Sequence, residues 1–155
     1  MSPDTRPAPM SPDAMRALLP TLFAPWVQAL GLSVDDTPTD AGPAGDAGQA
    51  DLQLHLPVTP AVVHAGGVVC GQALMAAADT AAVLALARHL GGFRPMSTVQ
   101  LQTAFLRAVP AGTPALAVRA RVLKCGRRLA FVEVGLHLPG GALAAQATAT
   151  CALEG

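Results

Sequence analysis

The fifteen residues from Ala73 to Ala87, ALMAAADTAAVLALA, constrain the fold of this chain more than any other stretch of its sequence. Thirteen of them are apolar, and only Asp79 and Thr80 are not. Ala, Leu and Met favour helices, and a helix that is apolar all round is a buried helix. A carboxylate in such a helix carries a heavy desolvation cost unless it is paired, hydrogen-bonded or protonated. The stretch therefore predicts a buried central helix with one acid that is a candidate for a functional role.

The sequence around this stretch predicts one α+β domain in which an antiparallel sheet wraps around the central helix. The helix is expected to run from Gly71 to Leu90 and to end at Gly91-Gly92. Apolar and polar residues alternate with the period of a strand in several other segments. The predicted strands cover residues 32–37, 51–58, 97–106, 115–124, 129–138 and 142–153.

An extra N-terminal helix is predicted over residues 13–30, where Pro20 and Pro25 are expected to kink or split it. The Pro-rich residues 1–12 are predicted to be disordered. A length of 155 residues suits a single domain with a sizeable core, which we expect to span residues 13–155.

The composition favours a homo-oligomer with an apolar interface. Hydrophobic residues make up 52% of the chain and charged residues only 13%, and a lone monomer has difficulty hiding that much apolar surface. The net charge is zero, but residues 1–79 carry eight Asp and two Arg, or −6, whereas residues 80–155 carry seven Arg, one Lys and two Glu, or +6. A basic C-terminal half can attract an anionic ligand, although charges on edge strands also guard against aggregation.

Several classes of partner and cofactor are not expected. With one Trp, no Tyr and four Phe, the chain has little to stack on bases, which argues against a nucleic-acid partner. No run reaches about 18 apolar residues and the N-terminus lacks a signal-peptide pattern, so we expect no membrane partner and a cytoplasmic location. The three cysteines and four histidines show neither a disulfide framework nor metal-ligand spacing, so no metal is expected.

Four segments point to a known family. They are GGVVCGQALMAAADTA at residues 66–81, FLR at 105–107, GRRLAFVEV at 126–134 and AQATAT at 145–150. The first looks like the helix-entry motif of hotdog-fold acyl-CoA thioesterases of the phenylacetyl-CoA (PaaI-like) type, in the superfamily of the 4-hydroxybenzoyl-CoA thioesterases. That motif commonly reads His-Gly-Gly, six residues, then Asp or Glu. The other segments are similar to the family's Asn-Phe-Leu-Arg segment, penultimate hairpin and closing strand. The resemblance covers about residues 30–154 and implies a long sheet curled around the helix.

The resemblance assigns roles to three residues of this sequence. It implies that Asp79 is the catalytic carboxylate and that the backbone N–H of Gly71 is an oxyanion donor. His64 falls where relatives often place Asn, Gln or Arg beside the reacting thioester, although a loop His is as often simply solvated. Cys70 replaces the motif's His and Gln72 its second Gly, so a subgroup with a Gly-Gly-x-Val-Ser-Gly entry is the closer relative.

Elementary helix physics is consistent with these roles. The first N–H groups of a helix have no intrahelical partner and the helix dipole is positive there, which suits an oxyanion, although Gly71 also permits a simple turn. Asp79 lies eight residues further on, about 12 Å along the helix axis. The Gly71 N–H and the Asp79 carboxylate of one chain are therefore too far apart to act on the same carbon atom. Two copies packed antiparallel would pair Gly71 of one with Asp79 of the other. The family's arrangement places its sites at this dimer interface, so we expect a homodimer or a homotetramer.

The implied reaction is hydrolysis of an acyl-CoA thioester to a free acid and CoA, with CoA present as part of the substrate and no separate cofactor. Asp79 would act as general base or nucleophile, the alternative being a structural buried acid. Arg binds phosphate well, so Arg107, Arg127 and Arg128 are candidates for CoA binding, with solvated surface charges as the alternative. Thr80 is a further substrate-binding candidate, although such a Thr more often bonds to the carbonyl four residues before it.

Two other functions stay open on the sequence alone. The replaced motif His and Gly are compatible with a non-catalytic acyl-CoA-binding hotdog protein. A hotdog dehydratase or hydratase would act on acyl thioesters, but such enzymes normally pair a His with an acid, and this chain lacks the matching His-x-x-x-x-Pro-Gly segment. Thiol release from an acyl-CoA separates the hydrolase from both alternatives.

Overall fold

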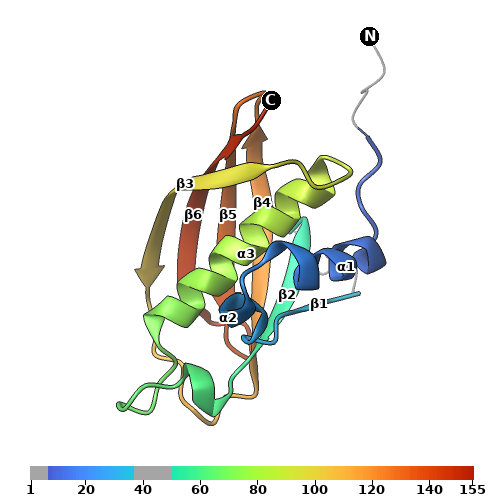
Figure 1. The fold of residues 1–155 in the computed structure, drawn as a ribbon. Helices are drawn as coiled ribbons and strands as arrows, with labels where there is room; N and C mark the ends of the chain where they lie inside the picture. Colours follow the sequence, from blue (N-terminus) through green and yellow to red (C-terminus); the bar gives the residue numbers. More distant parts are fainter. Residues whose placement is uncertain (1–6, 37–49) are drawn as a thin grey trace.

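The computed structural model describes residues 7–36 and 50–155, and in it one long helix lies against the face of an antiparallel sheet (Figure 1). The helical elements are α1 (Pro12–Leu22), α2 (Pro25–Gln28), the short 3-10 turn η1 (Pro60–Val62) and the central helix α3 (Gly71–His89). The strands are β1 (Ser33–Val34), β2 (Leu52–Pro57), β3 (Met96–Phe105), β4 (Ala115–Cys125), β5 (Leu129–His137) and β6 (Leu143–Leu153). The predicted α+β hotdog arrangement, with its central helix and extra N-terminal helix, is confirmed.

The strands form one six-stranded antiparallel sheet in the order β1-β2-β4-β5-β6-β3. Strand β3 lies at one edge, and β6 is its single neighbour among the described strands. The pairing of β3 with β6 shifts register between Thr98 and Gln100, which is a bulge that lets the strand bend. Figure 1 shows β3 starting beside the C-terminal end of α3 and finishing beside its N-terminal end. The edge strand therefore follows the central helix along its whole length.

The core lies between α3 and the sheet. The sheet supplies larger side chains at alternate positions, as in β2, where Leu52, Leu54 and Leu56 are buried. The helix supplies mainly alanine, the smallest apolar side chain, so its backbone can approach the strands closely. The alanines of α3 that are fully buried are Ala77, Ala78, Ala81, Ala82, Ala85 and Ala87. Large strand side chains thus face small helix side chains across the core.

The N-terminal segment packs over α3 on the side away from the sheet (Figure 1). Ser11 caps α1, because its hydroxyl accepts a hydrogen bond from the Ala14 N–H at 3.2 Å. The helix predicted over residues 13–30 is split, as expected. The break comes before Pro25, where Ala24 is extended, as a residue preceding proline tends to be. Pro20, in contrast, lies inside α1.

A pair of hydrogen bonds joins the start of the described chain to the end of α3. The Met10 N–H donates to the carbonyl oxygen of Arg88 at 3.2 Å, and the Arg88 guanidinium donates to the carbonyl oxygen of Met10 at 3.0 Å. Of the segment predicted to be disordered, residues 1–6 lie outside the described residues. None of the described helices is long and apolar enough to cross a membrane.

Candidate active site

One stripe of α3 is left partly or fully exposed by the rest of the described chain. This α3 stripe consists of Gln72, Met75, Ala76, Asp79 and Val83. Spacings of three and four residues place these side chains on one side of the helix. The prediction that the helix is buried all round is therefore wrong along this stripe, since none of the described residues of the chain covers it fully. The acid that the sequence singles out lies on this uncovered side and not in the core.

Asp79 is held by a residue of the edge strand. The hydroxyl of Thr98, in β3, donates a hydrogen bond to Oδ1 of Asp79 at 2.6 Å. The same hydroxyl oxygen lies 3.8 Å from Sγ of Cys151, whose burial raises the pKa of its thiol. Within residues 7–36 and 50–155, no cation pairs with Asp79 and no donor reaches Oδ2. One carboxylate oxygen is thus fixed by Thr98 while the other is left for water or substrate.

Sequence reasoning missed Thr98. Threonine is an ordinary residue for a β-strand, and Thr98 takes a normal place in the polar and apolar alternation of its segment. Its contact with Asp79 joins residues 19 positions apart and depends on how β3 bends past the helix. The only sequence signal that could have drawn attention to Thr98 is that it is a hydroxyl residue near the start of the strand that follows the central helix.

Gly71 is the first residue of α3 and lies against an aromatic ring. A Cβ atom at this position would meet Cζ of Phe105 at 3.1 Å, so a larger residue forces that ring to move. The preceding Cys70 gives no side-chain cap, and the first turn begins with Ala73 and Leu74 donating to the Cys70 carbonyl oxygen. Among the described residues, the Gly71 N–H therefore has no acceptor, which is the condition an oxyanion donor must meet.

His64 lies in the hairpin turn that precedes α3 and is exposed. Its Nδ1 accepts a hydrogen bond from the Gly66 N–H at 2.8 Å, and the Gly67 N–H donates to its carbonyl oxygen at 2.9 Å. Gly67 has a φ of +78°, which glycine adopts readily. The ring therefore keeps only Nε2 for a substrate. In the part of the chain described, no three His, Cys, Asp or Glu side chains gather as a metal site.

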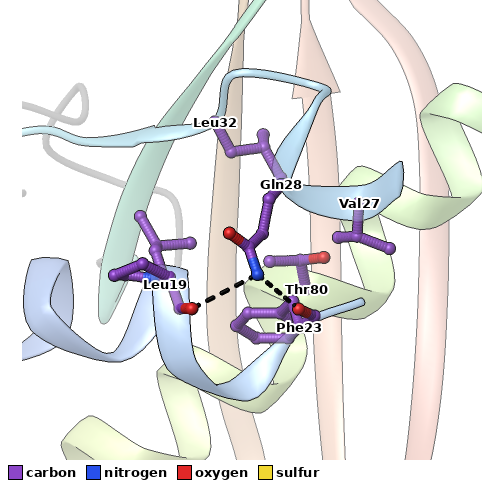
Figure 2. A pocket seen from close by; sticks show the side chains of 7 residues that line it. Leu19, Phe23, Val27, Gln28, Leu32 and Thr80 are labelled. Carbon is purple, nitrogen blue, oxygen red and sulfur yellow. Dashed lines mark hydrogen bonds between the residues drawn. The ribbon is translucent and has the colours of Figure 1, made fainter. Parts of the chain in front are cut away.

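Thr80 takes a different side of the helix from Asp79. It is buried, and its hydroxyl donates to the Ala76 carbonyl oxygen at 2.8 Å, the local bond that competes with substrate binding. Thr80 also lines a cavity of about 170 Å³ beneath the N-terminal segment (Figure 2). The structure thus separates Thr80 from the α3 stripe, although the two side chains are neighbours in sequence.

The structure places the three arginine candidates at opposite ends of the sheet. Arg107 follows β3 at the Gly71 end and donates to the carbonyl oxygen of Leu143 at 2.8 Å. Arg127 and Arg128 are exposed in the turn between β4 and β5, at the end where β3 begins. There they line a surface depression together with Arg94, which sequence reasoning missed and which donates to the carbonyl oxygen of Arg127 at 3.2 Å. Three guanidinium groups thus gather at that end.

Comparisons with known proteins bear on the family and the fold of this chain. The family model described as the thioesterase superfamily matches residues 66–145, which is just over half of the 155-residue chain. A comparison with curated proteins gives no match.

Solved structures show the same fold. One is a phenylacetic acid degradation-related protein from Ralstonia eutropha, with 29% identity, a TM-score of 0.69 and coverage of 90% of this chain and 98% of that one. A conserved protein from Pseudomonas aeruginosa has 27% identity and a TM-score of 0.69, covering 86% and 96%. A thioesterase from Haemophilus influenzae, at 18% identity, shares the fold with a TM-score of 0.75 over 94% and 91%. Because the family model matches just over half of the chain, from the turn before α3 into β6, this chain belongs to the thioesterase superfamily.

Proposed function

We propose that this protein hydrolyses an acyl-CoA thioester to a free acid and CoA. One observation carries the proposal: Asp79 lies on the α3 stripe with one oxygen held by Thr98 and the other open. A carboxylate in that state can take a proton from water or attack a carbonyl carbon itself. Membership of the thioesterase superfamily supports a thioester as the substrate. Similarity to a protein related to phenylacetic acid degradation supports a carboxylic acid as the product.

A second copy of the chain would complete the site. The outer edge of β3 has no partner among the described strands and carries exposed apolar side chains, with Val99 at 59% and Phe105 at 51% exposure. An unpaired apolar edge of ten residues is a template for another strand. Two copies joined along β3 by a two-fold axis would bring their α3 stripes together in antiparallel directions. Gly71 of each copy would then approach Asp79 of the other.

The proposed chemistry uses groups from both copies. Asp79 removes a proton from water, the hydroxide oxygen attacks the thioester carbon, and the carbonyl electrons move onto oxygen. The N–H of Gly71 in the second copy donates to this oxyanion, a contact worth about 3–4 kcal/mol in the transition state. Collapse of the intermediate breaks the C–S bond, and the CoA thiolate leaves and takes up a proton. Asp79 acting as nucleophile would instead form a mixed anhydride that water then opens.

The arginines at the two ends of the sheet would bind the phosphates of CoA. Arg127 and Arg128, with Arg94, form the larger positive group, and guanidinium groups suit phosphate because they donate two parallel hydrogen bonds. Arg107 at the Gly71 end is the alternative anchor, although one of its donors is used by Leu143. His64 could donate from Nε2 to the thioester carbonyl.

The test of this function is thiol release from a panel of acyl-CoA substrates that includes acetyl, hexanoyl, decanoyl and phenylacetyl groups. We expect turnover by the wild type and a loss of about 10²- to 10⁴-fold in kcat for Asp79→Asn, because the variant keeps the shape but loses the base. Asp13→Asn, which changes an exposed carboxylate on α1, is the matched control and should keep full activity. Binding of acyl-CoA without thiol release would point to the non-catalytic alternative, and near wild-type turnover in Asp79→Asn would refute the assigned role.

A further inference from the structure

A cavity beneath the N-terminal segment has no role in the chemistry described above. Its volume is about 170 Å³, and it lies between the α1–α2 corner and α3 (Figure 2). Its lining is mostly apolar and contains no charged residue; the lining residues are Leu19, Pro20, Phe23, Val27, Gln28, Leu32 and Thr80. Burying a charged group here would carry a large desolvation cost, so the cavity suits an uncharged ligand.

The polar groups at the cavity are already largely committed. The side-chain amide of Gln28 donates to the carbonyl oxygens of Phe23 at 2.7 Å and Pro20 at 3.3 Å, which fixes the corner between α1 and α2. The hydroxyl of Thr80 donates to Ala76 within α3. The Gln28 amide and the Thr80 hydroxyl therefore have their donors engaged within the chain. Binding in the cavity would depend on shape and on burial of apolar surface.

The cavity wall includes the residue that follows the candidate carboxylate in the sequence. Thr80 follows Asp79 directly, with Cα atoms about 3.8 Å apart and side chains about 100° apart around the helix. Ala76 and Val83 lie between these two directions, since each is three or four residues from both, and both are partly exposed. Ala76 presents only a methyl group, so its side chain rises little above the helix surface. An apolar chain attached to a carbonyl at Asp79 would have to cross the helix there to reach the cavity.

We infer that this cavity holds the far end of the acyl group, and that the N-terminal segment thereby sets the acyl length that the site accepts. The inference rests on the proposed function and deepens it. An apolar cavity of about 150 Å³ holds a benzene-sized molecule, so this one suits a single phenyl ring or roughly six aliphatic carbons. The substrate class is therefore an uncharged acyl group of medium size, such as hexanoyl. Short acetyl groups fall short of the cavity, and decanoyl groups exceed it.

The test compares kcat/KM for acetyl-, hexanoyl- and decanoyl-CoA in variants of Val27, which lines the cavity. The Val27→Phe variant fills the space, and we expect it to lower the ratio of hexanoyl to acetyl kcat/KM by about tenfold or more, since one or two carbons of fit are worth that much. The Val27→Ala variant enlarges the space and should raise the ratio of decanoyl to hexanoyl severalfold. A gain on the longer substrate does not arise from a folding defect. The control is Trp26→Ala, a neighbouring change on α2 at a side chain that is 62% exposed and outside the cavity lining.

The outcomes separate this inference from the function on which it rests. A lower ratio of hexanoyl to acetyl kcat/KM in Val27→Phe, together with a higher ratio of decanoyl to hexanoyl kcat/KM in Val27→Ala, supports the cavity as the acyl site. Turnover in which both ratios stay at their wild-type values overturns the inference and leaves the hydrolase function standing. Absence of thiol release by the wild type from every acyl-CoA overturns the function, and this inference falls with it.

Discussion

At the scale of a single residue, Thr98 is the group that connects the edge strand to Asp79, and we expect it to act as a positioning residue. Thr98→Val removes the donor that fixes Oδ1 while keeping the side-chain shape. Hydrogen bonds to charged groups contribute about 1.5–3 kcal/mol, so kcat should fall by about 10- to 100-fold with little change in KM. Steady-state kinetics on hexanoyl-CoA measure both parameters.

The matched control for this prediction is Thr98→Ser. Serine keeps the hydroxyl and loses a methyl group, so most of kcat should be retained. An equal loss in the serine and valine variants would show that packing near Cys151, and not the hydrogen bond, is what matters.

A second residue-scale prediction concerns Glu133 on the face of the sheet away from α3. The Arg121 guanidinium donates to Glu133 at 2.8 Å and, with Gln146 at 2.7 Å, holds the pKa of this carboxyl below its usual value despite partial burial. A lowered folded-state pKa stabilises the fold above the unfolded value of about 4.3, and this contribution is lost as pH falls through the folded pKa.

Glu133→Gln should therefore lower the free energy of unfolding by about 0.2–1 kcal/mol at pH 7, the usual range for a partly exposed ion pair. The difference from wild type should shrink as pH falls below about 4.3 and should approach zero only at a pH below the lowered folded-state pKa of Glu133, where both forms are uncharged. Urea unfolding at the two pH values measures this. A difference that is the same at both pH values would show that charge plays no part.

Two of the candidate residues that the sequence predicts stand out from their local pattern. Asp79 interrupts an apolar run and Gly71 begins it, so both are visible without a structure. Thr98 and Arg94 match the pattern around them, and only the approach of distant segments brings them into contact with the candidate residues Asp79 and Arg127. The alternative considered for Thr80, a bond to the carbonyl of Ala76, is confirmed because such a bond is local and depends on helix geometry alone.

At the scale of elements, the alanine face of α3 sets how closely the helix lies on the sheet. Ala81 is fully buried there and belongs to the hydrophobic core. Ala81→Leu adds three carbons to a packed interior and should lower the free energy of unfolding by about 1–3 kcal/mol. Ala17→Leu, on the exposed side of α1, is the control and should change it by less than about 0.5 kcal/mol. Chemical denaturation followed by circular dichroism provides both values, and equal stability of the two variants would contradict the close packing.

Element types followed from periodicity because strands such as β2 and β5 bury alternate side chains and α3 needs a continuous apolar surface. The position of β3 at the sheet edge did not follow, since strand order depends on contacts between segments that a one-dimensional pattern does not contain. The cavity beneath the N-terminal segment was missed for the same reason. Its walls come from α1, α2 and α3, and its shape depends on the corner that Gln28 fixes.

At the scale of the whole molecule, a site shared between two copies predicts recovery of activity when two inactive variants are mixed. Asp79→Asn lacks the carboxylate, and Gly71→Pro lacks the N–H donor. Proline is tolerated at the first position of a helix, and the preceding Cys70 is already extended, with φ −69° and ψ 147°, as proline requires. In a mixed dimer, Gly71 of one chain still meets Asp79 of the other, so random pairing should restore about a quarter of wild-type activity.

Thiol release after joint refolding or coexpression of the two chains measures this recovery. Gly71→Ala is the control for the added bulk beside Phe105, because it introduces a Cβ and keeps the N–H. No recovery in mixtures that contain mixed dimers would place both groups of a site in the same chain and contradict the proposed interface.

The origin of the cavity walls has an evolutionary consequence. Six of the seven lining residues come from residues 19–32, whereas Asp79, Thr98 and Gly71 belong to the segment from α3 to β3. Substitutions that reshape the cavity therefore leave the reacting groups untouched. If the cavity selects the acyl group, a lineage can change its substrate by drift in a short N-terminal stretch while selection holds the chemistry constant. Related proteins that share the α3 entry and differ before residue 33 would then be expected to divide among acyl lengths.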